Sequence, residues 1–136
     1  MVRTNSLRVA VGVLLAAIPS ADARAAEDDF ATRFKQADLN IQAEPAHEFV
    51  HGPFSKDFYQ QYPGWLSECM KETAGSEVAA FDIVIKLAAN GQAETVMARP
   101  HTAMSSCFVK LVKARKFPPP PSAHFWLPVE IKFTKQ

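Results

Sequence analysis

Apolar and polar positions alternate over residues 81–87, where Phe, Ile, Ile and Leu fall on one face and Asp, Val and Lys on the other. A period of two predicts a β-strand. Asn90-Gly91 follows as a strong turn signal, since both central positions of a type I′ turn need a positive φ. Pro100 then ends the second strand. We therefore predict a β-hairpin before this proline.

A helical period follows the hairpin. The apolar stripe of residues 102–117 consists of Met104, Cys107, Phe108, Leu111 and Val112. Serine and lysine occupy the opposite face, as in an amphipathic helix. The four prolines at 118–121 prevent the helix from continuing. Residues 125–134 alternate again and predict a last strand, which Pro128 should place at a sheet edge because it lacks an N–H group.

The chain before the hairpin is predicted to be helical with interruptions. Apolar residues at positions 30, 34, 37 and 41 form one helical stripe. Residues 42–54 contain two prolines and a glycine and are predicted to be a loop, and Pro63-Gly64 should end the short helix after it. The predicted fold class is α+β. It is a small antiparallel sheet, formed by the hairpin and the C-terminal strand, packed against a helix, with a helical N-terminal extension.

The first residues have the layout of a secretory signal. Arg3 and Arg8 precede an apolar run over residues 9–18, and small residues in A-x-A spacing follow up to Ala25. This run is short of the roughly 20 residues that span a membrane. We expect a cleaved signal peptide over 1–25, a periplasmic or secreted protein, and no integral membrane anchor in the mature chain. The predicted parts are then a helical preface with a loop (26–54) and an α+β domain (55–136).

Charge and cysteine content narrow the function. The formal net charge is +1, which does not predict nucleic-acid binding. The residues from Ser105 to the C-terminus include six Lys or Arg residues and one acidic residue, Glu130. This excess of positive charge indicates either a solvated helix face or a surface for an acidic partner. Cys69 and Cys107 are the two cysteines of a chain expected to be exported. An even count in an oxidising compartment predicts a disulfide bond between them.

The segment His47-Glu48-Phe49-Val50-His51 matches the H-E-x-x-H motif of zinc peptidases. In that chemistry His47 and His51 hold the metal, Glu48 activates water, and Asp57 is a possible third ligand. The prolines around the motif disfavour the helix that the motif needs. We therefore expect an exposed loop with no cofactor, and a minimal zinc metallopeptidase is the alternative function.

The order of several short patterns carries a resemblance. Tyr62-Pro63 comes before the hairpin, a helix that ends in an aromatic residue and proline follows it, and the strand LPVEIKF comes last. In this order and spacing, residues 58–134 resemble a TonB C-terminal-type domain. They also resemble the related AgmX/PglI C-terminal domain of bacterial envelope proteins, to which the positions of the two cysteines are similar.

This resemblance implies a non-enzymatic module that binds a protein or peptide partner in the bacterial envelope. TonB-type domains take up an extended segment at an open sheet edge, where unpaired backbone groups accept another strand. The last strand is the expected edge, with Trp126, Glu130, Lys132 and Thr134 as its site residues. Alternatively, its proline and charges protect the edge. Without the anchor and long proline-rich linker of TonB itself, we do not expect energy transduction.

Overall fold

The computed structural model describes residues 21–74 and 78–133. Residues 1–20 of the predicted signal peptide, and Thr134 of the predicted edge, lie outside these ranges. In chain order the elements are α1 (Ala21–Asn40), α2 (Ala46–Phe49), the π-helix η1 (Val50–Phe54), α3 (Ser55–Glu72), β1 (Phe81–Leu87), β2 (Ala93–Arg99), α4 (Ala103–Lys113) and β3 (Phe125–Ile131). None of the helices in the described ranges has the length and hydropathy to cross a membrane.

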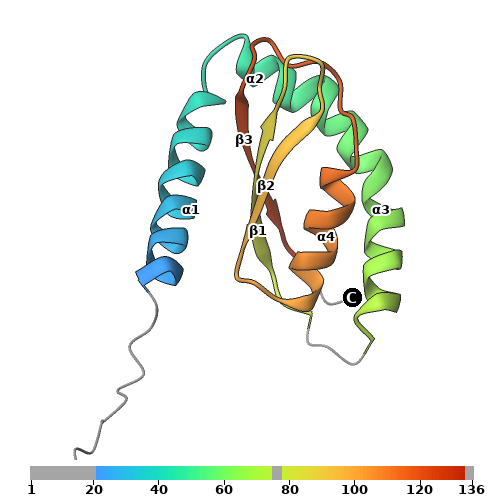
Figure 1. Cartoon of the computed structure of the whole chain (residues 1–136). Coiled ribbons are helices and arrows are strands. Elements are labelled where there is room, and N and C mark those ends of the chain that lie inside the picture. The colour runs from blue at the N-terminus through green and yellow to red at the C-terminus, as the bar shows by residue number, and fades with distance from the viewer. Residues whose placement is uncertain (1–20, 75–77, 134–136) are drawn as a thin grey trace, which may run out of the picture.

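The three strands form one antiparallel sheet in the order β2-β1-β3, which confirms the predicted α+β class (Figure 1). The predicted hairpin joins β1 to β2, but the predicted type I′ turn is wrong. In this turn Gly91 alone has a positive φ, of 90°. Its N–H group donates to the carbonyl of Ala88, which closes a four-residue turn, and its carbonyl accepts from the N–H of Phe117. Docking against the segment around Phe117 therefore shapes the turn.

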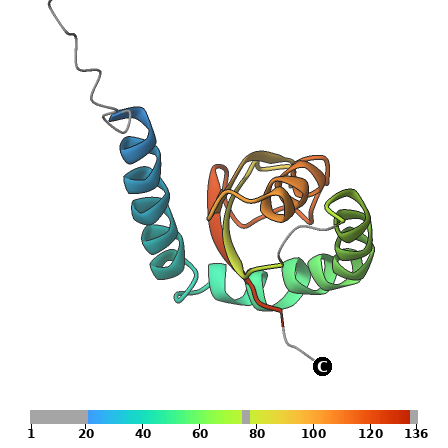
Figure 2. The same ribbon diagram turned by 90° about the horizontal axis from the view of Figure 1, so that it is seen from below.

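A helical layer covers each face of the sheet (Figure 2). On one face α3 and α4 pack over Ile85 and Leu87 of β1, which are fully buried. On the other face α1 contacts the strands, with Phe30 and Ala37 buried and Val84 of β1 completely covered. The N-terminal helix is present as predicted, and it also supplies one of the three layers of the domain.

The predicted loop over residues 42–54 is wrong. Turns occupy only residues 41–45, after which α2, η1 and α3 follow one another without a break from Ala46 to Glu72. The helical run continues through residue 54, where η1 passes directly into α3. In Figure 2 this helical run, in green, curves around the core.

Two prolines lie inside this helical run without ending it. Pro53 is in η1, where the wider turn of a π-helix leaves room for its ring. The hydroxyl of Ser55 donates to the Val50 carbonyl in the same turn. Pro63 is in α3, so the predicted helix end at this residue is also wrong. Its missing N–H group leaves the carbonyl of Tyr59 without a helical partner, on a side of the helix where the Tyr59 side chain is 70% exposed.

Cys69 of α3 and Cys107 of α4 form the predicted disulfide bond, with their Cα atoms 5.7 Å apart. Both residues are buried. At the start of α4, the hydroxyl of the N-cap residue Thr102 accepts from the Ser105 N–H, and the hydroxyl of Ser105 accepts from the Thr102 N–H. This capping box fixes the start of α4 directly after β2.

Candidate functional site

The structure brings the two predicted metal-binding histidines together. His47 and His51 lie on one exposed face of the helical run, with ring centroids 4.3 Å apart. The Nδ1 atom of His47 is also 3.4 Å from a carboxylate oxygen of Glu44. The helix that the zinc motif needs is thus present, because the π-turn accommodates Pro53.

Asp57, the possible third ligand, is engaged elsewhere. Arg115 donates two hydrogen bonds to its carboxylate, of 2.6 Å from Nη2 and 3.3 Å from Nε. This hydrogen bonding raises the pKa of Arg115 above its ordinary value. Across residues 21–74 and 78–133, no three His, Cys, Asp or Glu side chains are grouped to hold a metal ion. The described residues therefore supply a histidine pair and not the ligand set of a catalytic zinc site.

The predicted binding edge, β3, is an edge of the sheet as expected. Pro128 pairs with Val84 of β1 in an uninterrupted register. Because Pro128 has no N–H group, the two residues cannot exchange both backbone hydrogen bonds, so the backbone groups of Trp126, Pro128 and Glu130 point away from β1. The middle donor of this outward row is missing, which weakens β3 as a template for another strand.

The predicted site residues on β3 already contact other parts of the chain. Trp126 is half-buried, with the Arg33 guanidinium 4.9 Å and the Lys86 ammonium 5.7 Å from its ring centroid. Glu130 and Lys132 are exposed and form an ion pair of 3.2 Å. A groove of about 290 Å³ adjoins this edge, between α1 and α3.

The opposite edge, β2, is not among the predicted sites, yet its backbone is better suited to pairing. Val84 directs its backbone groups toward β2, where it pairs with Met97. The N–H and C=O groups of Val96 and Ala98 therefore point outward. No proline lies within β2, so this edge presents two donors and two acceptors. The next outward acceptor, the carbonyl of Pro100, receives a 2.8 Å hydrogen bond from the Ser105 hydroxyl, which ends the free edge.

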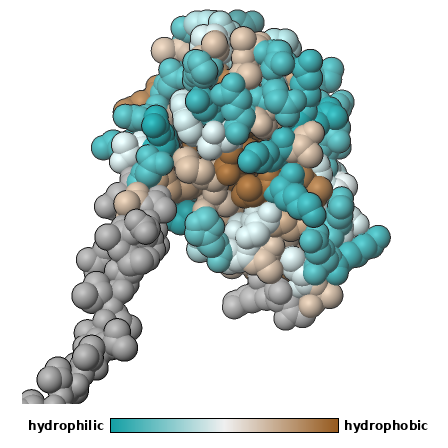
Figure 3. All heavy atoms as spheres, in the orientation of Figure 1, coloured by the Kyte–Doolittle hydropathy of each residue, from teal (hydrophilic) through white to brown (hydrophobic). Residues whose placement is uncertain are grey.

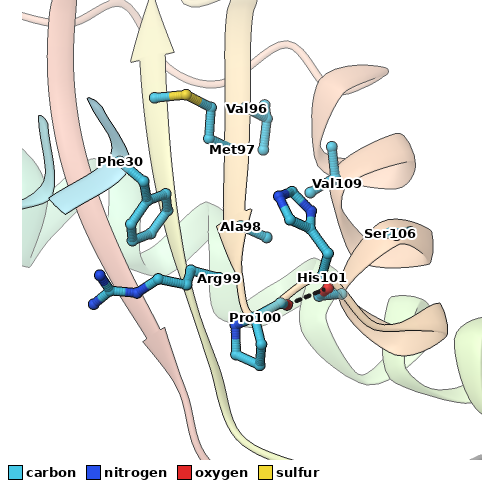
Figure 4. A pocket seen from close by; sticks show the side chains of 10 residues that line it. Phe30, Val96, Met97, Ala98, Arg99, Pro100, His101, Ser106 and Val109 are labelled. Atoms are coloured by element: carbon cyan, nitrogen blue, oxygen red, sulfur yellow. Dashed lines mark hydrogen bonds between the residues drawn. The ribbon is translucent and has the colours of Figure 1, made fainter. Parts of the chain in front are cut away.

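A groove of about 780 Å³ follows the β2 edge (Figure 4). Its floor is the outward side of β2, Phe30 of α1 stands on one side, and Ser106 and Val109 of α4 stand on the other. Seen as in Figure 1, the surface in Figure 3 has apolar side chains near the middle of this face, with hydrophilic ones around them. An unpaired edge at the floor of an apolar groove can accept an extended chain.

The sequence contains only a weak signal for the β2 site. Residues 93–99 read AETVMAR, a strand without proline that is bounded by the turn and by Pro100. The alternation predicts the strand, but it does not say whether β2 is central or at an edge. Phe30, which forms one wall of the groove, belongs to a helix more than 60 residues before β2 in the chain. No local sequence pattern predicts that this helix lies beside β2.

Fold and site together define an α+β domain with an open sheet edge in an apolar groove. Comparison with known proteins gives no match, since no protein-family model, no curated protein and no solved structure is significantly similar to this chain. These comparisons do not identify a TonB C-terminal-type domain.

Proposed function

We propose that this protein is an exported, non-enzymatic module that binds a partner protein by pairing an extended segment of it with the free edge of β2. One observation carries this proposal. Four outward backbone groups, on Val96 and Ala98, line the floor of a groove between two helices. Unpaired edge groups of this kind supply affinity through main-chain hydrogen bonds, and side-chain pockets beside them supply specificity.

Export to the periplasm or the exterior is part of the proposal. The signal-like N-terminus supports it, and so does a disulfide bond, which persists in oxidising compartments. The resemblance to TonB C-terminal-type domains supports the binding mode. This resemblance does not favour one sheet edge over the other. The β3 edge, which the sequence predicts as the binding edge, is the alternative position for the partner strand.

Proline substitutions distinguish the two edges. Val96→Pro removes an outward N–H group from β2, and Glu130→Pro removes one from β3. Neither change removes a hydrogen bond to β1, because both groups point outward. As probes we would select peptides from a displayed library of random nine-residue sequences, using the full chain with its disulfide intact, and measure their affinity by calorimetry. Circular dichroism would verify that both variants are folded.

We expect selected peptides to lose at least tenfold in affinity with Val96→Pro and to bind Glu130→Pro as they bind the wild type. Amide exchange gives a second readout. The Val96 amide should exchange rapidly in the free protein and become protected on binding, whereas the Met97 amide should be protected in both states. Loss of affinity with Glu130→Pro alone would move the site to β3, and no loss with either variant would overturn strand addition.

A further inference from the structure

We infer that the β2 groove selects an extended segment whose side chains alternate between aliphatic and acidic, with a carboxylate beside Arg99. This inference rests on the proposed strand addition and adds the chemistry of the partner. In an added strand, successive side chains point to opposite faces of the sheet. The two walls of the groove therefore contact alternate residues of the segment.

The wall toward α4 is mostly apolar, with the His101 ring beside Val109 and Ser106 close by. Val96 and Ala98 point to this side in Figure 4, toward Val109. Ala98 is buried, and Val96 and Val109 are half-buried. An aliphatic side chain of the partner placed against Val96 and Val109 would lose contact with water.

The wall toward α1 is cationic. Met97 and Arg99 point to this side, and the Arg99 guanidinium lies 5.0 Å from the centroid of the Phe30 ring. Asp82 stands directly across from Arg99 in the register, but the two side chains form no ion pair. Among the described side chains, no carboxylate pairs with Arg99. Stacking on Phe30 holds its planar donors in place, which suits recognition of a carboxylate.

The surrounding charges favour the same partner. Lys110 and Lys113 are exposed on α4, one helical turn beyond the groove residues Ser106 and Val109. Near the other end of β2, the Oε2 atom of Glu94 is 3.5 Å from Nζ of Lys86 and 3.6 Å from Nδ1 of His124. The groove therefore presents a net positive charge, and an acidic segment is electrostatically complementary to it.

The free edge also limits the length of the segment. At one end of β2 the free edge stops because the Ser105 hydroxyl donates a hydrogen bond to the Pro100 carbonyl. At the other end it stops because the register with β1 shifts after Lys86. Between these two limits, Val96 and Ala98 are the residues whose N–H and C=O groups both point away from β1. A partner segment of about five residues covers this span, since each strand residue advances about 3.4 Å.

Parallel peptide selections test the predicted side-chain chemistry of the partner segment. The nine-residue library would be selected on the wild type, on Arg99→Glu, and on Lys71→Glu, a charge reversal at an exposed residue of α3 outside the groove. We expect the wild type and Lys71→Glu to enrich Asp or Glu at alternate positions between Val, Ile, Leu or Ala. Arg99→Glu should enrich Lys or Arg at the acidic position. A wild-type peptide should bind Arg99→Glu at least tenfold more weakly.

The outcomes separate this inference from the proposed function. If Arg99→Glu selects the same sequences as the wild type while Val96→Pro still abolishes binding, strand addition stands and the acidic partner is wrong. If Val96→Pro leaves binding intact, both proposals fail. A dimer of the peptide-free chain in sedimentation, lost with Val96→Pro, would assign the groove to a second copy of this chain and overturn the inference.

Discussion

Arg115 and Asp57 form a two-point ion pair that fixes the segment just after α4 against the first turn of α3. Asp57 is the residue that a zinc peptidase would use as a ligand, and the structure gives it a structural contact instead. Its side chain is 17% exposed and that of Arg115 36%.

A double-mutant cycle should measure this contact. We expect Asp57→Asn and Arg115→Gln to show a coupling free energy of about 1 kcal/mol in urea unfolding. Hydrogen bonds to charged groups contribute more when buried, and partial exposure reduces the value. The coupling should decrease in 1 M salt, where screening is strong. Additive single effects would mean that the pair does not stabilise the fold.

Gly91 and Gly64 should respond oppositely to alanine. A Cβ atom on Gly91 would lie 1.9 Å from the Phe117 carbonyl oxygen, and its φ of 90° disfavours a side chain. We expect Gly91→Ala to lower the free energy of unfolding by at least about 2 kcal/mol. Gly64 is helical with open space around it, so Gly64→Ala should raise stability by about 0.5–1 kcal/mol. Thermal unfolding of both variants checks the contrast.

The disulfide bond closes a loop with a sequence separation of 38. On the chain-entropy model, reducing it should cost about 4 kcal/mol of stability. We expect a large fall in the unfolding temperature of the Cys69→Ala/Cys107→Ala double variant. Alkylation followed by mass spectrometry should modify neither cysteine before reduction and both after it. Two reactive thiols in protein isolated from the periplasm would contradict the predicted bond.

Stability should fall at high pH through Tyr62. Burial, and secondarily the neighbouring Tyr59, raises the pKa of Tyr62 above its ordinary value of 10.0. The folded state therefore holds this proton more tightly than the unfolded state does. Its stabilising contribution is complete below pH 10 and is lost as the pH rises through the folded pKa. Urea unfolding between pH 8 and 11 should show a steeper loss for the wild type than for Tyr62→Phe, and identical slopes would refute this assignment.

The histidine pair should bind zinc weakly. His47 and His51 supply two ligands, and the described residues bring no third to them. After incubation with zinc and desalting, we expect substoichiometric metal by mass spectrometry, and no change in the unfolding temperature with His47→Ala. One tightly held zinc per chain, lost with His47→Ala, would instead favour the peptidase alternative.

Local sequence determined the elements whose signals are local. Alternation and the Asn90-Gly91 turn specified the hairpin, the apolar spacing from Met104 to Val112 specified α4, and an even number of cysteines specified the disulfide bond. Each of these signals lies within one element or pair of residues, so no distant contact is needed to recognise it.

The tertiary structure decided what depends on distant contacts. Prolines 53 and 63 predict breaks, but packing of Phe54, Phe58 and Trp65 into the core stabilises a helix through both. Packing also placed α1 over the second face of the sheet and β2 at its edge. The periodicity of a strand gives its two faces, whereas its neighbours and the walls beside it depend on how the whole chain packs.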